Sequence, residues 1–426
     1  MKRSILTKTL IVVALSLGAL SGAYAKGQQA PQYPNTHREA PQNDLRSQRD
    51  SQQLQEGFNA LNKGAKQKAV EILGKLLNNT SSKYAKAMAL RGLAQIKLNA
   101  HQYSMALPLL QKALNLNSMP NNAYFNTMLT IAQVQAQSEQ WRPALTTLQK
   151  WMKEGDKQSG KAYALQGNIF YRLNQYQNAI NSMKQALGLS KNAPESWQQI
   201  LMASYFELGQ YAEAAKLEET ILAVHPGNKK VLGNLVNIYI KANEPAKALA
   251  AMADAKARGV FSTEKDYLKL AKLYVYIAQN ENDTKKEKKE AIQAAQTLQE
   301  GINIGIVKPG LKPYKLMGNA YYLAGNYKQA MAAWSKASPF ATNGEVDFTL
   351  GNVQMQDGQY RKGQTTLHKA LKRGVKRVGA AWILIGNADI NLRNHKGAIY
   401  AYRQAAKHPA TRVAAEKWLR GQRRGR

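Results

Sequence analysis

Residues 318–330 read GNAYYLAGNYKQA, and residues 167–179 read GNIFYRLNQYQNA. Both stretches open on a Gly-Asn pair, pass through a short turn that contains Gly or Asn, and continue with a Tyr three positions before a small residue. Apolar residues recur along them at helical spacing, and strand-like alternation is absent. A turn between two periodic segments predicts a pair of helices, and the small residues predict where the two helices touch.

The same unit recurs along most of the chain. A small residue is required in the second helix because a large side chain would push the two helices apart. Aligned on that residue, the units place it at Ala69, Ala106, Ala144, Ala179, Ala214, Ala248, Ala294, Ala330, Gly363 and Ala398. Neighbouring members are 33 to 38 residues apart, with one interval of 46. The longer interval predicts a charged insertion at about 279–290, as a loop or a helix extension.

This pattern resembles the tetratricopeptide repeat, a helix–turn–helix unit of about 34 residues. The resemblance implies an all-α, right-handed superhelical solenoid of about ten helix–turn–helix repeats over residues 51–410. Residues 411–426 are predicted to form a capping helix, with Val413, Ala414 and Trp418 on its apolar side, and a basic tail. A cap is expected because the last stacking face of a solenoid would otherwise be wet.

The N-terminus has the pattern of a targeting segment. Three basic residues precede an apolar run over residues 10–20, and Ala23-Tyr24-Ala25 has the small-x-small pattern of a cleavage site. A retained membrane anchor is the alternative, but a spanning helix needs roughly 20 apolar residues. We therefore expect residues 1–25 to be a cleaved signal peptide and the mature chain to be periplasmic, with no transmembrane segment. Residues 26–50 are polar and predict a flexible leader.

The composition argues against catalysis. The 426 residues include no cysteine, which excludes disulfides, thiolate zinc sites and thiol nucleophiles. The six histidines are not paired with one another or with carboxylates at metal-ligand spacing, and no phosphate-binding glycine loop is present. We therefore predict that the protein is not an enzyme and has no catalytic residue, metal site or cofactor.

The resemblance places the first helix of each repeat on the concave face of the solenoid. Position 9 of these helices is Asn in five repeats, and an Asn amide both donates and accepts hydrogen bonds. A ladder of such amides would hold an extended peptide backbone; the alternative is that Asn is merely frequent at this position. The predicted peptide-binding groove comprises Asn168, Asn237, Lys315, Asn319, Tyr322, Asn352 and Asn387.

Some tetratricopeptide proteins bind a C-terminal carboxylate through a clamp of Lys and Asn side chains. Lys315 and Asn319 match the first half of that clamp. Thr349, Ala380 and Leu384 stand where its later members are expected. The sequence therefore does not predict binding of a chaperone tail.

Positive charge is concentrated at the C-terminal end. The chain has 60 Lys and Arg against 27 Asp and Glu, and residues 360–426 hold 17 of those cations with two acids. Such a field attracts anions over about a Debye length; solubility alone is the alternative. Nucleic acid is not expected, because an exported protein seldom meets any and the tail lacks interleaved aromatic residues. The predicted basic docking patch comprises Arg361, Lys362, Lys369, Lys372, Arg373, Lys376, Arg377, Arg420, Arg423, Arg424 and Arg426.

These features predict a protein–protein interaction scaffold, because a solenoid without a catalytic set presents an extended binding surface. Exported, cysteine-free proteins of about ten such repeats resemble the tetratricopeptide proteins that accompany TonB-type energy-transduction systems in Gram-negative bacteria. The resemblance implies a periplasmic scaffold whose partners are envelope proteins, such as a TonB-type complex, and an anionic envelope surface. Two alternatives stay open: an envelope-assembly or secretion adaptor that binds peptidoglycan or a polysaccharide machine, and the regulatory subunit of an enzyme.

Overall fold

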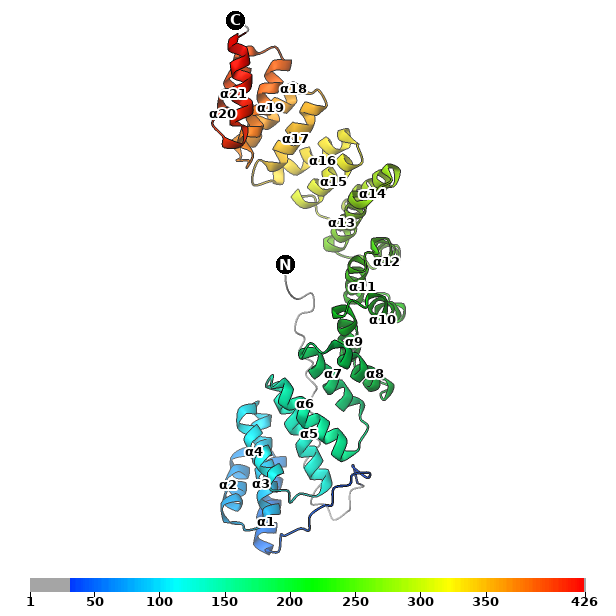
Figure 1. The fold of residues 1–426 in the computed structure, drawn as a ribbon, viewed down its shortest axis with the longest axis vertical. Helices are drawn as coiled ribbons and strands as arrows, with labels where there is room; N and C mark the ends of the chain where they lie inside the picture. The colour runs from blue at the N-terminus through cyan, green and yellow to red at the C-terminus, as the bar shows by residue number, and fades with distance from the viewer. Residues whose placement is uncertain (1–30, 425–426) are drawn as a thin grey trace. The chain divides into compact units, whose positions relative to one another are not determined.

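The computed structural model describes residues 31–424, and over that range it contains helices and no strands (Figure 1). The predicted all-α class is therefore confirmed. Residues 1–30, which include the predicted signal peptide, lie outside the described range. The helices are α1 (Gln48–Asn62), α2 (Lys66–Asn79), α3 (Lys83–Asn99), α4 (Tyr103–Asn115), α5 (Asn121–Gln137), α6 (Trp141–Gly155), α7 (Gly160–Arg172), α8 (Tyr176–Gly188), α9 (Glu195–Glu207), α10 (Tyr211–Val224), α11 (Lys229–Lys241), α12 (Pro245–Ala257), α13 (Glu264–Asn280), α14 (Thr284–Asn303), α15 (Leu311–Leu323), α16 (Tyr327–Ala337), η2 (Ser338–Phe340), α17 (Glu345–Gln356), α18 (Tyr360–Lys372), α19 (Val378–Asn391), α20 (His395–Ala406) and α21 (Pro409–Arg424).

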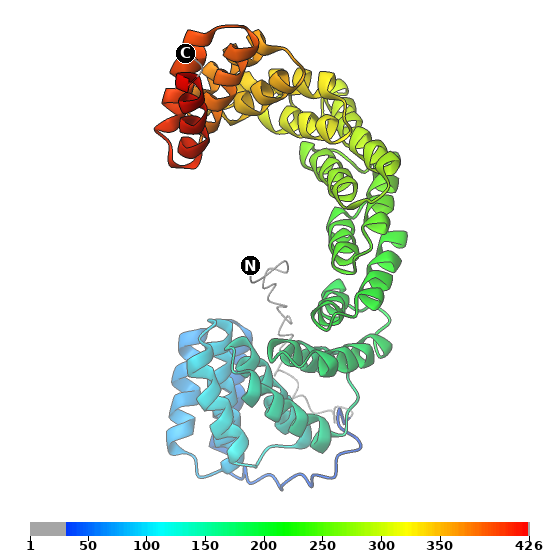
Figure 2. The same ribbon diagram turned by 45° about the horizontal axis from the view of Figure 1, so that its top comes forward.

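The helices form successive antiparallel pairs in two compact units. The units are Met1–Leu217 and Glu218–Arg426, here called unit 1 and unit 2, and the boundary falls within α10. In unit 1, α1 to α4 lie side by side (Figure 2). Each helix from α1 to α8 and from α11 to α20 packs against the next, as α7 packs against α8 and α8 against α9. Helices α1 to α20 therefore make ten pairs, the number that the repeat spacing predicts.

The register of the pairs is set by the small residue of the second helix. The nine aligned alanines are 0% exposed, and Gly363 is also buried. Each stands at the fourth position of its helix, except Ala294, which is the eleventh residue of α14. The predicted insertion is thus a helix extension, because it lengthens α14 at its N-terminal end instead of forming a long loop.

Large side chains of the second helix fill the space above glycines of the first. Gly318 of α15 lies against the indole of Trp334 of α16, and a Cβ there would overlap the ring. At Gly386 of α19, a Cβ would lie 2.7 Å from the ring of Tyr402 of α20. The glycine therefore lets an aromatic side chain, 16 residues further along the chain, occupy the interface of the pair.

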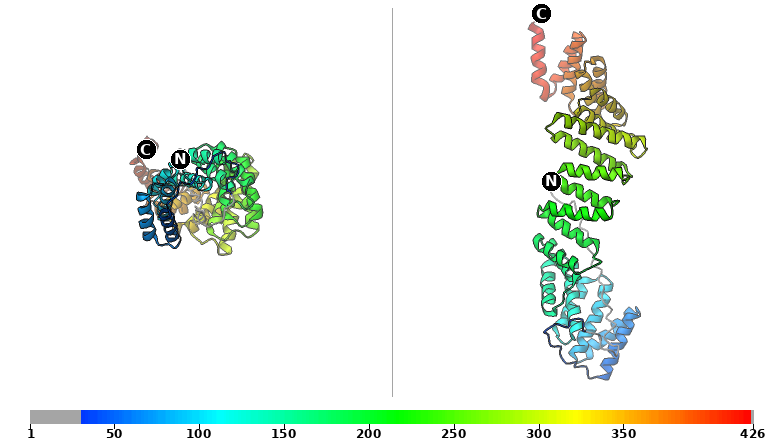
Figure 3. Two further views of the ribbon diagram at one scale, coloured as in Figure 1. Left: turned by 90° about the horizontal axis from the view of Figure 1, so that it is seen from below. Right: turned by 90° about the vertical axis from the view of Figure 1, so that its right-hand side faces the viewer.

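Helix α21 is the last helix of unit 2, at the red end of the chain (Figure 3). It buries a face other than the predicted one. Trp418 stacks on Tyr402, with ring centroids 4.0 Å apart and an interplanar angle of 11°, and Ala415 is fully buried. Val413 is 76% exposed, and Ala414 is exposed as well. The prediction that Val413 and Ala414 lie on the apolar side is wrong, because the stacking of Trp418 fixes the rotation of the helix.

Residues 31–47 depart most from the sequence expectation. They form neither helix nor strand before α1 begins at Gln48, with a turn at Pro34 and Asn35, and they cross the ends of unit 1 helices as the dark blue segment before α1 (Figures 1 and 2). Tyr33 is 4% exposed, and the segment bonds to residues 38 to 118 positions further along the chain. The expectation of a flexible leader does not hold for these residues, because their partners are distant in sequence and local composition does not show them.

Asp44 fastens this segment to the start of α3. Its carboxylate accepts hydrogen bonds from the Ser82 hydroxyl (2.6 Å) and from the backbone N–H groups of Lys83 (2.7 Å) and Tyr84 (3.0 Å). The first turn of a helix has backbone donors without helical partners, so a carboxylate there is stabilising. The segment therefore caps a helix that lies in the second pair of unit 1.

We expect the attachment of Asp44 to depend on pH. Burial raises its pKa, but the hydrogen bonds from Ser82, Tyr84 and Lys83 outweigh burial, so the pKa lies below its ordinary value of 3.8. A depressed carboxyl pKa gives stability that is present above the ordinary pKa and is lost as pH falls below it. The difference in unfolding free energy between the wild type and Asp44→Asn should therefore shrink from pH 6 to pH 3. Denaturant titrations followed by circular dichroism measure it; a difference independent of pH would contradict this role.

Candidate functional site

The predicted groove residues lie on the first helices of their pairs. Asn237 lies on α11, Asn319 on α15, Asn352 on α17 and Asn387 on α19, and each is exposed or half-buried in unit 2. Asn168 lies on α7 of unit 1 and is only 7% exposed. Its side chain is therefore not open to a peptide, in contrast to the sequence expectation.

Two of these amides are held by aromatic side chains of their own repeats. The Trp334 indole N–H donates to Oδ1 of Asn319 (3.2 Å), and the Tyr402 hydroxyl donates to Oδ1 of Asn387 (2.6 Å). In both cases the donor stands 15 residues later, on the second helix. The amide oxygen is thus engaged within the repeat, and the amide NH₂ is left to donate to a ligand such as a peptide carbonyl.

Lys315, Asn319 and Tyr322 share one side of α15, because they are four and three positions apart. We call these three exposed residues the α15 face. The Tyr322 ring is 41% exposed and lies 5.5 Å from the ring of Tyr327 and 5.8 Å from that of Trp334. An ammonium group, an oriented amide donor and an aromatic surface are thus brought together. This set suits a peptide, which offers carbonyl oxygens and apolar side chains.

Two cations of the predicted basic patch form ion pairs with a buried carboxylate. Asp347 of α17 is 0% exposed, and Nη1 of Arg373 lies 2.8 Å from its Oδ2. Nζ of Lys369 lies 3.3 Å from Oδ1, and the Ser338 hydroxyl donates to the same oxygen at 2.5 Å. A buried carboxylate requires such partners because desolvation penalises its charge. Arg373 is therefore structural, which corrects its prediction as a free docking residue. Lys369 also pairs with Asp347, but its side chain is 51% exposed and still faces solvent.

The other described cations of that patch face solvent. Arg361, Lys362, Lys372, Lys376 and Arg377 are exposed, and we call these five residues the exposed cations. The Arg377 guanidinium also lies over the Phe348 ring at 4.2 Å, and Nη1 of Arg420 lies 3.8 Å from the Glu416 carboxylate. The side chains of Arg423 and Arg424, and the whole of Arg426, lie outside the part of the chain that the structure describes.

A row of aromatic rings lies among these cations, and it was not predicted as a site. The Trp382 ring is 5.6 Å from His368 and 5.8 Å from Tyr400, edge to face in both cases. Trp382 is half-buried, and Tyr400 is 57% exposed. We call His368, Trp382 and Tyr400 the aromatic row. The sequence signal for the aromatic row is twofold. Its rings recur at about half a repeat, and α18 and α20, which carry His368 and Tyr400, contain no acidic residue.

The histidines and acids are dispersed. Within residues 31–424, no group of three or more His, Asp or Glu side chains could hold a metal ion. His101 occupies the turn between α3 and α4 with a φ of 55°, and His395 is the first residue of α20. A search of the same range finds no helix with the length and apolar character needed to cross a membrane.

Paired helices in register define a helical-repeat protein, a class that binds other molecules on extended surfaces. Comparison with protein families specifies the repeat. Residues 205–272 and 348–411 each match a tetratricopeptide repeat model, and residues 38–237 match the C-terminal ARM domain of tetratricopeptide repeat protein 21. These segments are thus similar to tetratricopeptide repeats, as the sequence resemblance implied.

Parts of the chain are also similar to known proteins and solved structures at low identity. The chain is 32% identical over 79 residues to interferon-induced protein with tetratricopeptide repeats 2 of Cricetulus griseus, a match that spans 18% of this chain and only 16% of that protein. A crystal structure of a tetratricopeptide repeat protein from Parabacteroides merdae is 14% identical, with a TM-score of 0.39, and covers 72% of this chain and 100% of that one. MamA from Desulfovibrio magneticus is 16% identical, with a TM-score of 0.37, and covers 43% of this chain and 98% of that one.

Proposed function

We propose that the protein is an exported, non-catalytic scaffold that binds partner proteins in the periplasm, as a tetratricopeptide component of a TonB-type energy-transduction system. Repeats of this family support the scaffold role. The N-terminal pattern of basic residues, apolar run and small-x-small motif supports export. The TonB assignment draws on the resemblance of exported, cysteine-free, ten-repeat chains to the proteins of those systems.

The α15 face is the observation that best supports binding of a partner protein. Its amide is oriented by Trp334 before any ligand arrives, so less conformational entropy is lost on binding. Tyr322 adds an exposed aromatic surface of the kind that is enriched at binding hot spots. The partner that suits this face is an extended or helical segment that supplies carbonyl oxygens to Asn319 and Lys315 and an apolar side chain to Tyr322.

The exposed cations would guide an anionic partner to the same unit. Each Lys or Arg near an anionic membrane surface contributes about 1 kcal/mol at moderate salt, so three of them change affinity by about 100-fold. We expect the triple variant Arg361→Gln, Lys362→Gln, Lys372→Gln to bind vesicles of phosphatidylglycerol and phosphatidylcholine about 100-fold more weakly than the wild type. Vesicle sedimentation at several salt concentrations measures the change.

The matched control removes the same charge elsewhere in unit 2. Lys285, Lys286 and Lys288 are exposed on the N-terminal extension of α14, and their replacement by Gln should leave vesicle binding close to that of the wild type. If the two triple variants lose equal affinity, net charge alone accounts for the attraction and the docking patch is refuted.

Crosslinking in the native envelope tests the proposed function directly. The mature protein is crosslinked in its own cells and purified, and the captured proteins are identified by mass spectrometry. Recovery of TonB-type inner-membrane components supports the proposal. Recovery of peptidoglycan or polysaccharide machinery without them would refute the energy-transduction role.

The aromatic row favours a second candidate, an envelope-assembly adaptor that binds peptidoglycan or another acidic polysaccharide. Aromatic faces offer apolar surface with defined geometry, and the neighbouring cations suit carboxylates of the polymer. Trp382→Ala should abolish such binding while leaving capture of protein partners through the α15 face unchanged. Sedimentation of the protein with purified peptidoglycan separates this candidate from the first.

A further inference from the structure

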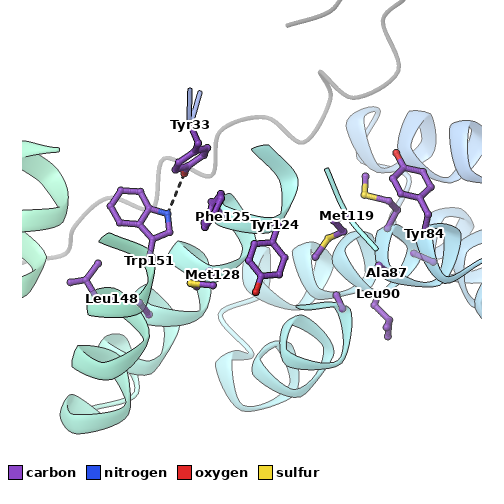
Figure 4. Close-up of a cluster of buried hydrophobic side chains, with 14 of the residues drawn as sticks. Tyr33, Tyr84, Ala87, Leu90, Met119, Tyr124, Phe125, Met128, Leu148 and Trp151 are labelled. Atoms are coloured by element: carbon purple, nitrogen blue, oxygen red, sulfur yellow. Dashed lines mark hydrogen bonds between the residues drawn. The ribbon is translucent and has the colours of Figure 1, made fainter. Parts of the chain in front are cut away.

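Tyr33 of the N-terminal segment is inserted into unit 1 like an anchor residue (Figure 4). Its ring lies 4.8 Å from Phe125 and 5.9 Å from Trp151, edge to face with the latter. The Tyr33 hydroxyl donates to Oδ1 of Asn126 (2.8 Å) and accepts from the Trp151 indole N–H (3.2 Å). Both the apolar and the polar part of the side chain are therefore satisfied by α5 and α6.

Arg38, five positions later, makes the second anchor. Its guanidinium donates to Oδ1 of Asn121 (2.5 Å), to Oδ1 of Asn117 (2.9 Å) and to the carbonyl of Met119 (3.1 Å). Its Cζ lies 3.9 Å from the centre of the Tyr124 ring. Asn121 also donates from Nδ2 to the Arg38 carbonyl (3.0 Å). Hydrogen bonds to the side chain and to the backbone of one residue are thus combined.

Most residues around the two anchors are exposed, although Gln32 donates a backbone hydrogen bond to Asn122 (2.9 Å) and accepts one from Asn126 (3.1 Å). Pro34, Asn35, His37 and Glu39 are exposed. The Thr36 hydroxyl donates to the Glu154 carbonyl (2.6 Å) and accepts from the Arg38 backbone N–H within the segment (3.2 Å). Two well-packed anchors among near-neutral neighbours are the usual distribution of binding energy at a peptide interface. A segment that merely belonged to the core would bury more of its length, whereas only Tyr33 is buried between residues 31 and 47.

We propose that α5, α6 and the turn before α5 form a peptide-binding site of unit 1, which residues 31–38 occupy in cis. Its ligand in trans is a segment of a partner protein that carries Tyr, then a turn, and Arg five positions after the Tyr. The internal segment regulates the site by competition, because a short tether gives it an effective concentration of about millimolar order. The site involves no residue of the α15 face, so this proposal and the scaffold function can fail independently.

The test uses the full chain with a specific protease site introduced between Ala40 and Pro41, next to exposed residues of the segment. The protein is cut after folding, and a fluorescent peptide with the sequence of residues 31–40 is titrated by anisotropy. We expect saturable binding to the cut protein and at least 100-fold weaker binding to the uncut protein. A Tyr33→Ala or Arg38→Ala change in the peptide should weaken binding at least tenfold, whereas Asn35→Ala should not.

A second variant does not depend on cleavage. The uncut chain carrying Tyr33→Ala and Arg38→Ala should release its own segment and bind the wild-type peptide, and adding Asn121→Ala should weaken that binding about tenfold. Circular dichroism reports whether unit 1 stays folded. Loss of helical signal in both proteins would show that the segment is part of the core and would overturn the proposal. Absent binding, equal binding of all peptides, or exchange of the segment between two copies would also overturn it.

Discussion

Replacing Arg373 by Gln is expected to lower the free energy of unfolding by about 3 kcal/mol, the usual cost of leaving a buried charge without its partner. Arg373 pairs with the fully buried Asp347 and also donates to the carbonyl oxygens of Ser338 and Ala341. Gln removes the charge and reaches fewer of these acceptors, so Asp347 keeps only Lys369 and Ser338 nearby. Urea titration followed by circular dichroism measures the loss.

Arg361→Gln is the matched control, because it removes the same charge from an exposed side chain of the same patch. Its effect on stability should stay within about 0.5 kcal/mol. Adding Asp347→Asn to Arg373→Gln should recover part of the loss, because the remaining buried group is then neutral. Similar small effects at Arg373 and Arg361 would contradict the structural role and return Arg373 to the docking patch.

Gly318→Ala is expected to destabilise unit 2 by about 2 kcal/mol, the range for overpacking a filled interface. The added methyl group would overlap the Trp334 indole, which is 2% exposed and has no room to withdraw. This loss exceeds the gain of about 1 kcal/mol that Ala brings to a helix interior. Displacement of the indole should also free the Asn319 amide and weaken capture of a partner by the α15 face. Thermal unfolding measures the first effect and pull-down the second.

Gly233→Ala serves as the control for helix propensity. Gly233 lies inside α11, and a Cβ there meets no atom within 4 Å. This change should stabilise the protein by about 0.5 to 1 kcal/mol. If Gly318→Ala is stabilising too, the Trp334 indole does not fill the interface between α15 and α16.

The repeat architecture was predictable from the sequence because one local requirement recurs. A small residue must stand where two helices cross, so the series from Ala69 to Ala398 reports the register without knowledge of any distant contact. The extension of α14 follows from the same series. Position 9 of the first helices was also placed correctly on α11, α15, α17 and α19.

The features that the sequence did not reveal depend on partners far along the chain. Tyr33 and Arg38 sit in a polar stretch whose composition predicts flexibility, and their sites are built by residues of α5 and α6. Lys369 and Arg373 look like free cations until Asp347, on the first helix of the same pair, is seen to be buried beside them. The buried face of α21 depended on the stacking of Trp418 on Tyr402, which helical periodicity alone does not specify.

Site-specific photo-crosslinking tests the central claim, that the α15 face binds a partner protein, most directly. A photoreactive amino acid is placed at Tyr322, at the exposed cation Lys372, or at Val413, which is 76% exposed on the cap helix and belongs to no proposed site. Irradiation in intact cells should give one discrete adduct at Tyr322 and an adduct of the same envelope protein at Lys372. No adduct should form at Val413. Adducts at Val413 with none at Tyr322 would contradict the account and place partner binding on another surface.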